Sequence, residues 1–485
     1  VGTERELRWY DLITINSYWM GFNIVSATIT PLLLPYLVAL FVPSGQKNTY
    51  LAAIRVTSLA LAMLLQPVAG MLSDRCTHPL GRRRPYIIGG TLGTVLFLLL
   101  IGVSPRFADT MLGGGFSAAY LVLLLGIVLV QGASNISLGA VLGLIPDLVP
   151  LEQRGRVSGV KAVMELLPAF LIIPLGFLID AGHIWQILGI IAAALLAAMV
   201  VTVVFVREER LEVTPGGGSG ELLLRLLALV LIFVTTTRVV VWVVGSAGAW
   251  LAWLGADTAV QVLVVGAVGL AGMAVSIVAG VYLGAWVGIG QGARRHRSFI
   301  WWVTNRLLFL AAIGSIQGFA QYYLVDVVRV PSPATATTAV LAVAGVFLLV
   351  SALGGGYLAD RIGRKRLVGV SALIAAAGSV VLLLARDLPS VMLAVSIMGV
   401  GSGIFLATNW AMGTDLAPRQ EAGRYLGISN LAGAGAGIVG TGIGGPMADF
   451  FNDLQPGLGY TVILAVYAML FLLSVATLAR IKGVD

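Results

Sequence analysis

The sequence has little charge. Asp, Glu, Lys and Arg make up 11% of its 485 residues, whereas 58% of the residues are hydrophobic. Soluble domains carry about 25% charged residues. The composition therefore excludes an ordinary soluble domain and indicates a protein that lies in a membrane.

Several residue types needed for common chemistry are also scarce. Cys76 is the only cysteine, which excludes a disulfide within the chain. The three histidines, His78, His183 and His296, are far apart and form no metal-ligand pattern, so we expect no metal site. No Gly-Lys-Ser/Thr occurs, which argues against a P-loop and against direct coupling to ATP. We expect neither a cofactor nor an enzyme activity.

Long hydrophobic runs dominate instead. A bilayer core about 30 Å thick requires about 20 apolar residues in a helix. Fourteen stretches meet this requirement and predict an all-α polytopic membrane protein. The predicted helices are 12–41, 50–73, 85–104, 118–146, 157–181, 183–206, 222–254, 258–290, 299–328, 335–359, 366–385, 388–415, 422–448 and 459–480.

The basic residues predict the orientation in the membrane. Of the 30 Lys and Arg residues, 23 fall on one side of the predicted helices and four on the other, and Arg55, Arg238 and Arg306 lie within apolar segments. Cytoplasmic loops carry such an excess. We therefore expect both termini in the cytoplasm, with the plasma membrane as the location. The net charge of +8 then reflects topology, and we expect no nucleic-acid partner.

Two loops between predicted helices share one pattern. The first basic loop, residues 70–85, reads GMLSDRCTHPLGRRRP, and the second basic loop, residues 355–366, reads GGYLADRIGRKR. Both contain Gly-x-x-x-Asp-Arg, with an offset of 286 residues between Asp74 and Asp360. Downstream, the stretch 147–159 (DLVP, then GRVSG) matches 415–427 (DLAP, then GRYLG) with an offset of 268. The chain therefore contains an internal repeat.

The repeated loop resembles the signature loop of the major facilitator superfamily, which joins helix two to three and helix eight to nine. The resemblance implies a six-helix bundle in residues 1–206 and another in 299–485, with substrate bound between the halves. Residues 207–298 contain a Gly-rich linker and two additional helices, which departs from the twelve-helix pattern. We expect a major facilitator fold with two inserted helices, fourteen in all.

The extended first basic loop, Ser-Asp-Arg-Cys-Thr followed by Gly-Arg-Arg-Arg-Pro, resembles that of sucrose–proton and related glycoside–cation symporters. This resemblance implies proton-coupled symport of a small molecule such as a sugar or glycoside by alternating access. The expected partners are this substrate, protons and membrane lipids, and no protein partner is predicted. The alternatives are an exporter of drugs or lipids on the same fold, and a non-transporting assembly factor of a membrane complex.

The two basic loops are candidate gating elements. The resemblance implies that Asp74 and Asp360 pair with Arg156 and Arg424, and that breaking these pairs lets the halves rock. The alternative is a helix-end charge that anchors the loop among lipid headgroups. The candidate gating residues are Asp74, Arg75, Arg82, Arg156, Asp360, Arg361, Arg364 and Arg424.

Glu165 is the candidate proton carrier. It lies about eight residues inside the predicted helix 157–181, and an acid at that depth marks an ion or proton path by default. Its repeat counterpart is Gly433, so the scaffold does not require it. Lys161 lies four residues earlier on the same helix face, and a structural ion pair is the alternative.

Polar and aromatic residues within apolar helices are candidates for the substrate cavity, because amides and aromatic rings suit a polyol or glycoside. Their alternative role is to hold helices together. Arg306 has two alternatives, reaching toward the interface or facing the cavity. The candidates are Asn16, Asn23, Gln131, Asn135, Arg306, Gln317, Gln321, Asn409 and Trp410.

Overall fold

A computed structural model describes residues 7–112, 116–206, 208, 220–289, 297–416 and 422–482. By its internal contacts the chain separates into two compact units. The first unit is Val1–Val42 with Leu61–Leu223, and the second is Pro43–Ala60 with Leu224–Asp485. The helix α3 (Lys47–Asp74) therefore contributes its first part to the second unit and its remainder to the first.

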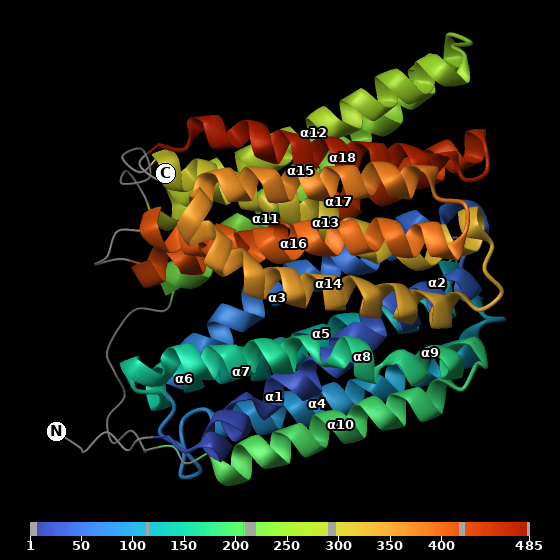
Figure 1. Ribbon diagram of the computed structural model, residues 1–485. Helices are drawn as coiled ribbons and strands as arrows, with labels where there is room; N and C mark the ends of the chain where they lie inside the picture. Colours follow the sequence, from blue (N-terminus) through green and yellow to red (C-terminus); the bar gives the residue numbers. More distant parts are fainter. Residues whose placement is uncertain are drawn as a thin grey trace. The chain divides into compact units, whose positions relative to one another are not determined.

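The first unit contains the elements up to α10 (Figure 1). Besides the second part of α3, these are α1 (Trp9–Thr28), the π-helical η1 (Ile29–Leu33), α2 (Leu34–Phe41), α4 (Arg84–Val103), η3 (Ser104–Phe107), β1 (Met111–Leu112), β2 (Phe116–Ser117), α5 (Ala118–Leu142), α6 (Leu144–Leu148), η4 (Leu151–Gln153), α7 (Arg154–Leu166), α8 (Pro168–Leu171), α9 (Ile173–Asp180) and α10 (Ile184–Phe205). Within this unit α4 packs against α5, and α1 packs against α10.

The second unit contains the first part of α3 and nearly all of the chain from α11 onward. Its elements are η2 (Ser44–Gln46), α11 (Gly220–Trp253), α12 (Thr258–Ile289), α13 (Arg297–Tyr323), the π-helical η6 (Leu324–Val328), α14 (Pro333–Ile362), α15 (Arg364–Leu384), α16 (Leu388–Leu416), α17 (Ala422–Leu454), α18 (Leu458–Thr477) and η7 (Leu478–Arg480). The predicted division at residues 206 and 298 stays a prediction.

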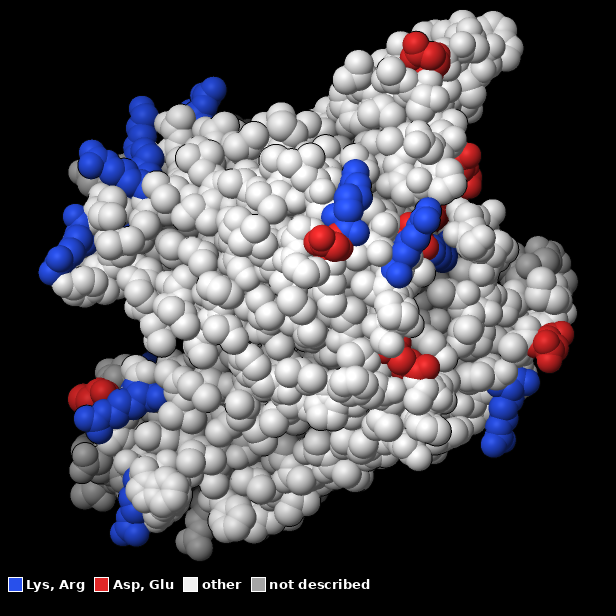
Figure 2. Space-filling view, turned by 45° about the vertical axis from the view of Figure 1, so that its right-hand side comes forward, with Lys and Arg blue, Asp and Glu red and all other residues white. Residues whose placement is uncertain are grey.

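Thirteen described segments are long and apolar enough to cross a membrane, and α17 is a further long helix. Side chains such as Trp242 and Leu353 remain exposed, as is expected of a lipid-facing surface. Figure 2 shows broad areas without a charged residue. The chain is an integral membrane protein, and its all-helical architecture is confirmed. In the described part of the chain, strands occur only in the short antiparallel β1–β2 pair, where Met111 opposes Ser117.

Proline interrupts one predicted helix. The stretch expected as a single helix at 157–181 consists of α7, α8 and α9, with breaks at Leu167 and Ile172. Pro168 and Pro174 follow these breaks. Proline lacks a backbone N–H and its ring clashes with the preceding turn, so it ends or kinks a helix. The three pieces still form one candidate span, Arg154–Asp180.

Helices α11 and α12 pack against later helices of the second unit. Phe233 of α11 is fully buried, and its ring lies against Gly280 of α12 and Gly435 of α17. Helix α12 also contacts α13 and α18. Glycine at the two contact positions leaves room for the Phe233 ring, because a Cβ at either one would overlap it.

Small residues also set the packing around α16, which lies against both α14 and α15. A Cβ at Gly403 would overlap the Leu348 carbonyl oxygen and the Ser351 hydroxyl of α14. Such residues let helix backbones approach closely, which is how helices associate where water drives no burial.

We expect Gly403→Ala to lower the free energy of unfolding by about 1–3 kcal/mol, the usual cost of overpacking. Gly354→Ala is the matched control, because nothing lies within 4 Å of a Cβ at that position of α14. Thermal unfolding in detergent measures both variants. Equal stability of the two variants would show that the α14–α16 contact is not as tight as described.

Candidate functional site

Arg83 is the centre of the first basic loop. Its side chain is buried and pairs with Asp74 at the end of α3. Its Nε and Nη2 atoms each lie 3.0 Å from Oδ2 of Asp147 in α6. Its Nη1 donates to the Ser73 hydroxyl at 2.6 Å. The guanidinium therefore joins three elements of the first unit through charge-assisted hydrogen bonds, which are stronger than neutral ones.

Two glycines make this arrangement possible. Gly81 has φ +112°, a backbone conformation that favours glycine. Gly143, at the α5–α6 junction, leaves the space that the Arg83 guanidinium occupies. We therefore expect that a side chain at Gly81 or at Gly143 would disturb the position of Arg83.

Glu208 of the first unit also contacts this loop. Its Oε2 accepts a hydrogen bond from the Arg83 backbone N–H at 2.7 Å. Burial raises the pKa of the Glu208 carboxyl; the Arg83 N–H and the charges of Arg84 and Arg83 oppose this shift. Sequence reasoning missed both Arg83 and Glu208. A run of three arginines gives no signal for the one that turns inward.

The second basic loop repeats part of this arrangement. Gly363 has φ +95°, and the next residue, Arg364, pairs with Asp415 at the end of α16. In the first loop, Arg82 follows Gly81 and pairs with Asp147. A turn on glycine followed by an Arg–Asp pair thus occurs once in each unit.

The other predicted gating residues lie apart from these pairs. Arg75 is half-buried, Arg156 is exposed, and Arg361 lies 4.5 Å from the Tyr357 ring centre. The side chains of Asp360 and Arg424 lie outside the described residues. Asp74 pairs with Arg83 within its own unit, and the predicted pairing of Asp74 with Arg156 stays a prediction.

Glu165 and Lys161 form the ion pair that their spacing predicts. Lys161 Nζ lies 3.2 Å from Glu165 Oε1, and both side chains are partly exposed. The same Nζ lies 4.0 Å from the ring centre of Trp19 on α1, a cation–π contact. The ammonium is therefore held by a carboxylate and an indole of the first unit.

The amides predicted for the cavity in the first unit bond mostly to backbone. Asn16 Nδ2 donates to the Leu12 carbonyl at 2.8 Å and to the Val157 carbonyl of α7 at 3.2 Å. Asn23 and Asn135 donate to the carbonyls four residues before them, and Gln131 is half-buried. Asn16 thus joins α1 to α7.

In the second unit Asn409 connects two helices. Its Nδ2 donates to Asn305 Oδ1 at 2.9 Å, and its carbonyl accepts from Trp302 Nε1 at 2.8 Å. Gln321 is buried, and its Oε1 has no partner in the part of the chain that the structure describes, whereas Gln317 is exposed.

Arg306 and Trp410 lie next to this bonded pair along α13 and α16. Arg306 Cζ is 4.8 Å from the Trp410 ring centre. Both side chains are half-buried, and Arg306 Nε and Nη1 are buried with no partner among the described residues. A guanidinium beside an indole offers hydrogen-bond donors and a flat apolar face together.

The start of α3 carries another group of contacts that sequence reasoning missed. Lys47 Nζ lies 2.7 Å from Asp326 Oδ2 of η6. The carboxylate of Asp449 in α17 accepts from the backbone N–H groups of Asn48 at 3.2 Å and Thr49 at 2.7 Å. The first helical amides need such acceptors, and a carboxylate suits the positive end of a helix.

The family model of the Major Facilitator Superfamily matches residues 12–441 and, again, residues 331–482. The chain belongs to this superfamily. This superfamily consists of transporters and not of enzymes.

Similar proteins of known name are distant. A general alpha-glucoside permease of Schizosaccharomyces pombe is 27% identical over 187 residues, which is 36% of this chain and 33% of the permease. A sucrose transport protein of Arabidopsis thaliana is 28% identical over 165 residues, 32% of this chain and 26% of that protein. The matches span about a third or less of these relatives' lengths.

Solved structures share the fold over nearly the whole chain. A D-xylose–proton symporter gives a TM-score of 0.62 at 16% identity, covering 98% of this chain and 97% of the symporter. A peptide transporter in complex with sulfate gives 0.63 at 14% identity, covering 99% and 98%. At these identities the similarity shows the fold alone.

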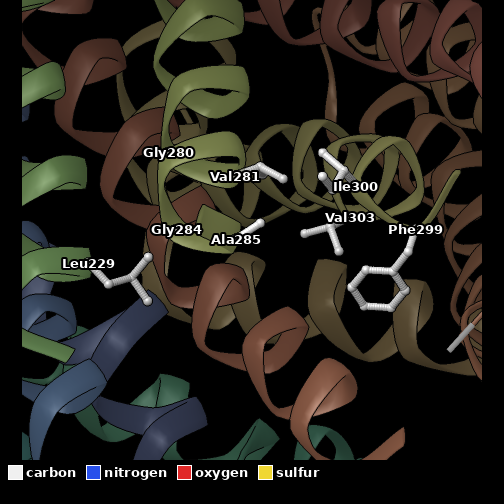
Figure 3. A pocket seen from close by; sticks show the side chains of 8 residues that line it. All are labelled: Leu229, Gly280, Val281, Gly284, Ala285, Phe299, Ile300 and Val303. Atoms are coloured by element: carbon white, nitrogen blue, oxygen red, sulfur yellow. The ribbon is translucent and has the colours of Figure 1, made fainter. Parts of the chain in front are cut away.

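A small pocket in the second unit is entirely apolar. Leu229 of α11 lines it, together with four residues of α12 and three of α13 (Figure 3). The lining residues are Leu229, Gly280, Val281, Gly284, Ala285, Phe299, Ile300 and Val303. Without a polar side chain, this pocket offers no hydrogen bond to a sugar hydroxyl.

We expect Arg83→Gln to lower the free energy of unfolding by about 1–3 kcal/mol, because it leaves Asp147 with less compensation for its partial burial. Arg156→Gln is the control; its side chain is exposed, so we expect a change within about 0.5 kcal/mol. Thermal unfolding of both purified variants measures this. If only Arg156→Gln lowered the thermal stability, this result would contradict the central role of Arg83.

Proposed function

We propose that the protein is a proton-coupled symporter of a sugar or glycoside that works by alternating access. Two distant relatives are named for alpha-glucosides and sucrose, and the fold is shared with a D-xylose–proton symporter. The plasma membrane as the location and cytoplasmic termini belong to the same proposal, supported by the distribution of basic residues.

The observation that carries the proposal is the Arg306–Trp410 pair. Apolar faces of sugar rings stack on indoles, and sugar hydroxyls accept hydrogen bonds from guanidinium groups. The unpartnered Nε and Nη1 of Arg306 cost free energy unless a ligand or water accepts from them. The hydrogen bond from Asn409 to Asn305 connects the two helices beside the pair.

Counterflow in proteoliposomes with a panel of labelled sugars and glycosides tests the transport function. We expect Trp410→Ala to raise the half-saturating concentration of the transported sugar by about tenfold, from lost stacking. Trp253→Ala is the control, because that indole lies at the end of α11 with 80% of its surface exposed. If a folded protein exchanges no sugar, the alternatives of a drug or lipid exporter or an assembly factor gain support.

Glu165 is the proposed proton carrier. We expect Glu165→Gln, which imitates the neutral acid, to abolish uphill accumulation driven by protons and to leave exchange of substrate nearly intact. Lys161→Ala removes the positive neighbour 3.2 Å away, and we expect it to raise the pH of half-maximal transport. Uphill accumulation by Glu165→Gln would make the ion pair structural and move the proton path elsewhere.

A further inference from the structure

Helix α11 has one face that packs within the second unit and an opposite face that does not. Phe233, Thr237 and Gly248 are buried and lie against α17. On the opposite face, exposed positions recur every three or four residues, which is the period of a helix. We call this face the outer stripe; it contains Thr235, Arg238, Trp242, Ser246, Ala249 and Trp253.

Arg238 places a charge in the middle of the outer stripe. It lies 15 residues from each end of the candidate membrane span Leu223–Trp253. This span of 31 residues is about 46 Å long and must tilt to fit a hydrocarbon core of about 30 Å, and tilting leaves its middle residue near the centre of the core. The side chain is exposed, and no described residue pairs or hydrogen-bonds with it. Charged side chains at such a depth almost always have a partner.

The hairpin of α11 and α12 supplies no counter-charge at this depth. Its acidic residues are Glu221, at the start of α11, and Asp257, in the turn between the two helices. Both lie 17 or more residues from Arg238, which corresponds to about 25 Å of helix. In Figure 1 this turn, drawn in lime, extends away from the other helices of the second unit. The described part of the second unit therefore offers Arg238 no carboxylate.

Charge decides between the possible occupants of the outer stripe. Two copies of this chain have the same orientation in one membrane, so a symmetric contact through the stripe would bring two Arg238 side chains to the same depth. Such like charges repel each other strongly in a medium of low dielectric constant. Lipid headgroups lie about 15 Å from the centre of the core. A carboxylate on another membrane-spanning helix can reach the guanidinium at its own depth and neutralise both charges.

We infer that the outer stripe binds a membrane-spanning helix of another protein, and that an aspartate or glutamate near the middle of that helix pairs with Arg238. The small side chains of Ser246 and Ala249 leave room for the backbone of such a helix to approach. Trp242 and Trp253, exposed by 71% and 80%, provide apolar contact area on the same face. This inference does not depend on the proposed sugar transport.

The test uses two synthetic membrane-spanning peptides of leucine and alanine, with lysines at both ends, that differ only in a central glutamate or glutamine. The protein carries a donor dye on Ala259→Cys, at the exposed start of α12, in a Cys76→Ser background, and each peptide carries an acceptor dye. In phosphatidylcholine vesicles at pH 8, we expect energy transfer to be half-maximal at an about tenfold lower peptide-to-lipid ratio with the glutamate peptide.

Variants assign this preference to Arg238. We expect Arg238→Gln to remove it and Arg238→Lys to retain part of it, because lysine keeps the charge. Arg238→Glu should transfer the preference to a third peptide with a central lysine. Arg225→Gln is the control, because this arginine lies 13 residues nearer the start of α11, a rise of about 20 Å, and should leave the preference for glutamate unchanged.

Several results would overturn the inference. Equal association of the glutamate and glutamine peptides would show that the outer stripe does not recognise a carboxylate. A glutamate preference that Arg238→Gln retains would place the recognising cation elsewhere. Energy transfer between differently labelled copies of the protein that the peptides do not reduce would assign the stripe to a second copy. Loss of the preference when phosphatidylglycerol replaces phosphatidylcholine would assign Arg238 to an anionic lipid.

Discussion

In a hydrocarbon environment every backbone polar group and every charge must find its partner within the protein. The long helices satisfy the backbone, and the spacing Lys161–Glu165 satisfies a charge within one helix. Arg83 meets a similar requirement in a loop, where its guanidinium pairs with Asp74 and Asp147 and donates a hydrogen bond to Ser73. Among the described residues, Arg55 and Arg306 each have a buried guanidinium nitrogen without a partner. The free-energy cost of such an unpaired group is the reason why Arg306 is proposed to bind substrate.

The repeated basic loops show how a sequence duplication becomes a structural one. In each unit a glycine with positive φ reverses the chain, and the following arginine pairs with an aspartate at the end of a later helix. The pairs Arg82–Asp147 and Arg364–Asp415 are therefore equivalent contacts in the two units. The loops differ at the next position, where the first has Arg83, which occupies the space that Gly143 leaves, and the second has Lys365, whose Nζ donates to the Ile481 carbonyl. The duplicated residues therefore specify the turn and its Arg–Asp pair, and the residue that follows makes different contacts in each unit.

Hydropathy and the basic loops were sufficient to predict the membrane helices and the superfamily, because both depend on residues close in sequence. The contacts of the candidate site residues depend on which side chains of neighbouring helices face one another, and a local sequence pattern does not show this. Asn16, Asn23 and Asn135 look like cavity residues in sequence, but their amide nitrogens donate to backbone carbonyls. Lys47 and Asp326 are 279 residues apart, and no local pattern connects them. Pro168 predicts a helix break. The sequence alone does not show that the pieces on either side of the break still form one membrane span, because this depends on the neighbouring helices.

The distribution of charge has a consequence for the energetics of the proposed transport. Lys161 and Glu165 are neutral as a pair, so protonation of Glu165 in the proposed mechanism leaves the pair with one positive charge. A neutral sugar does not compensate this charge. One proton moved with such a sugar then carries one net charge across the membrane, so the membrane potential, worth about 2.3 kcal/mol per charge at 100 mV, acts on the accumulation together with the proton gradient.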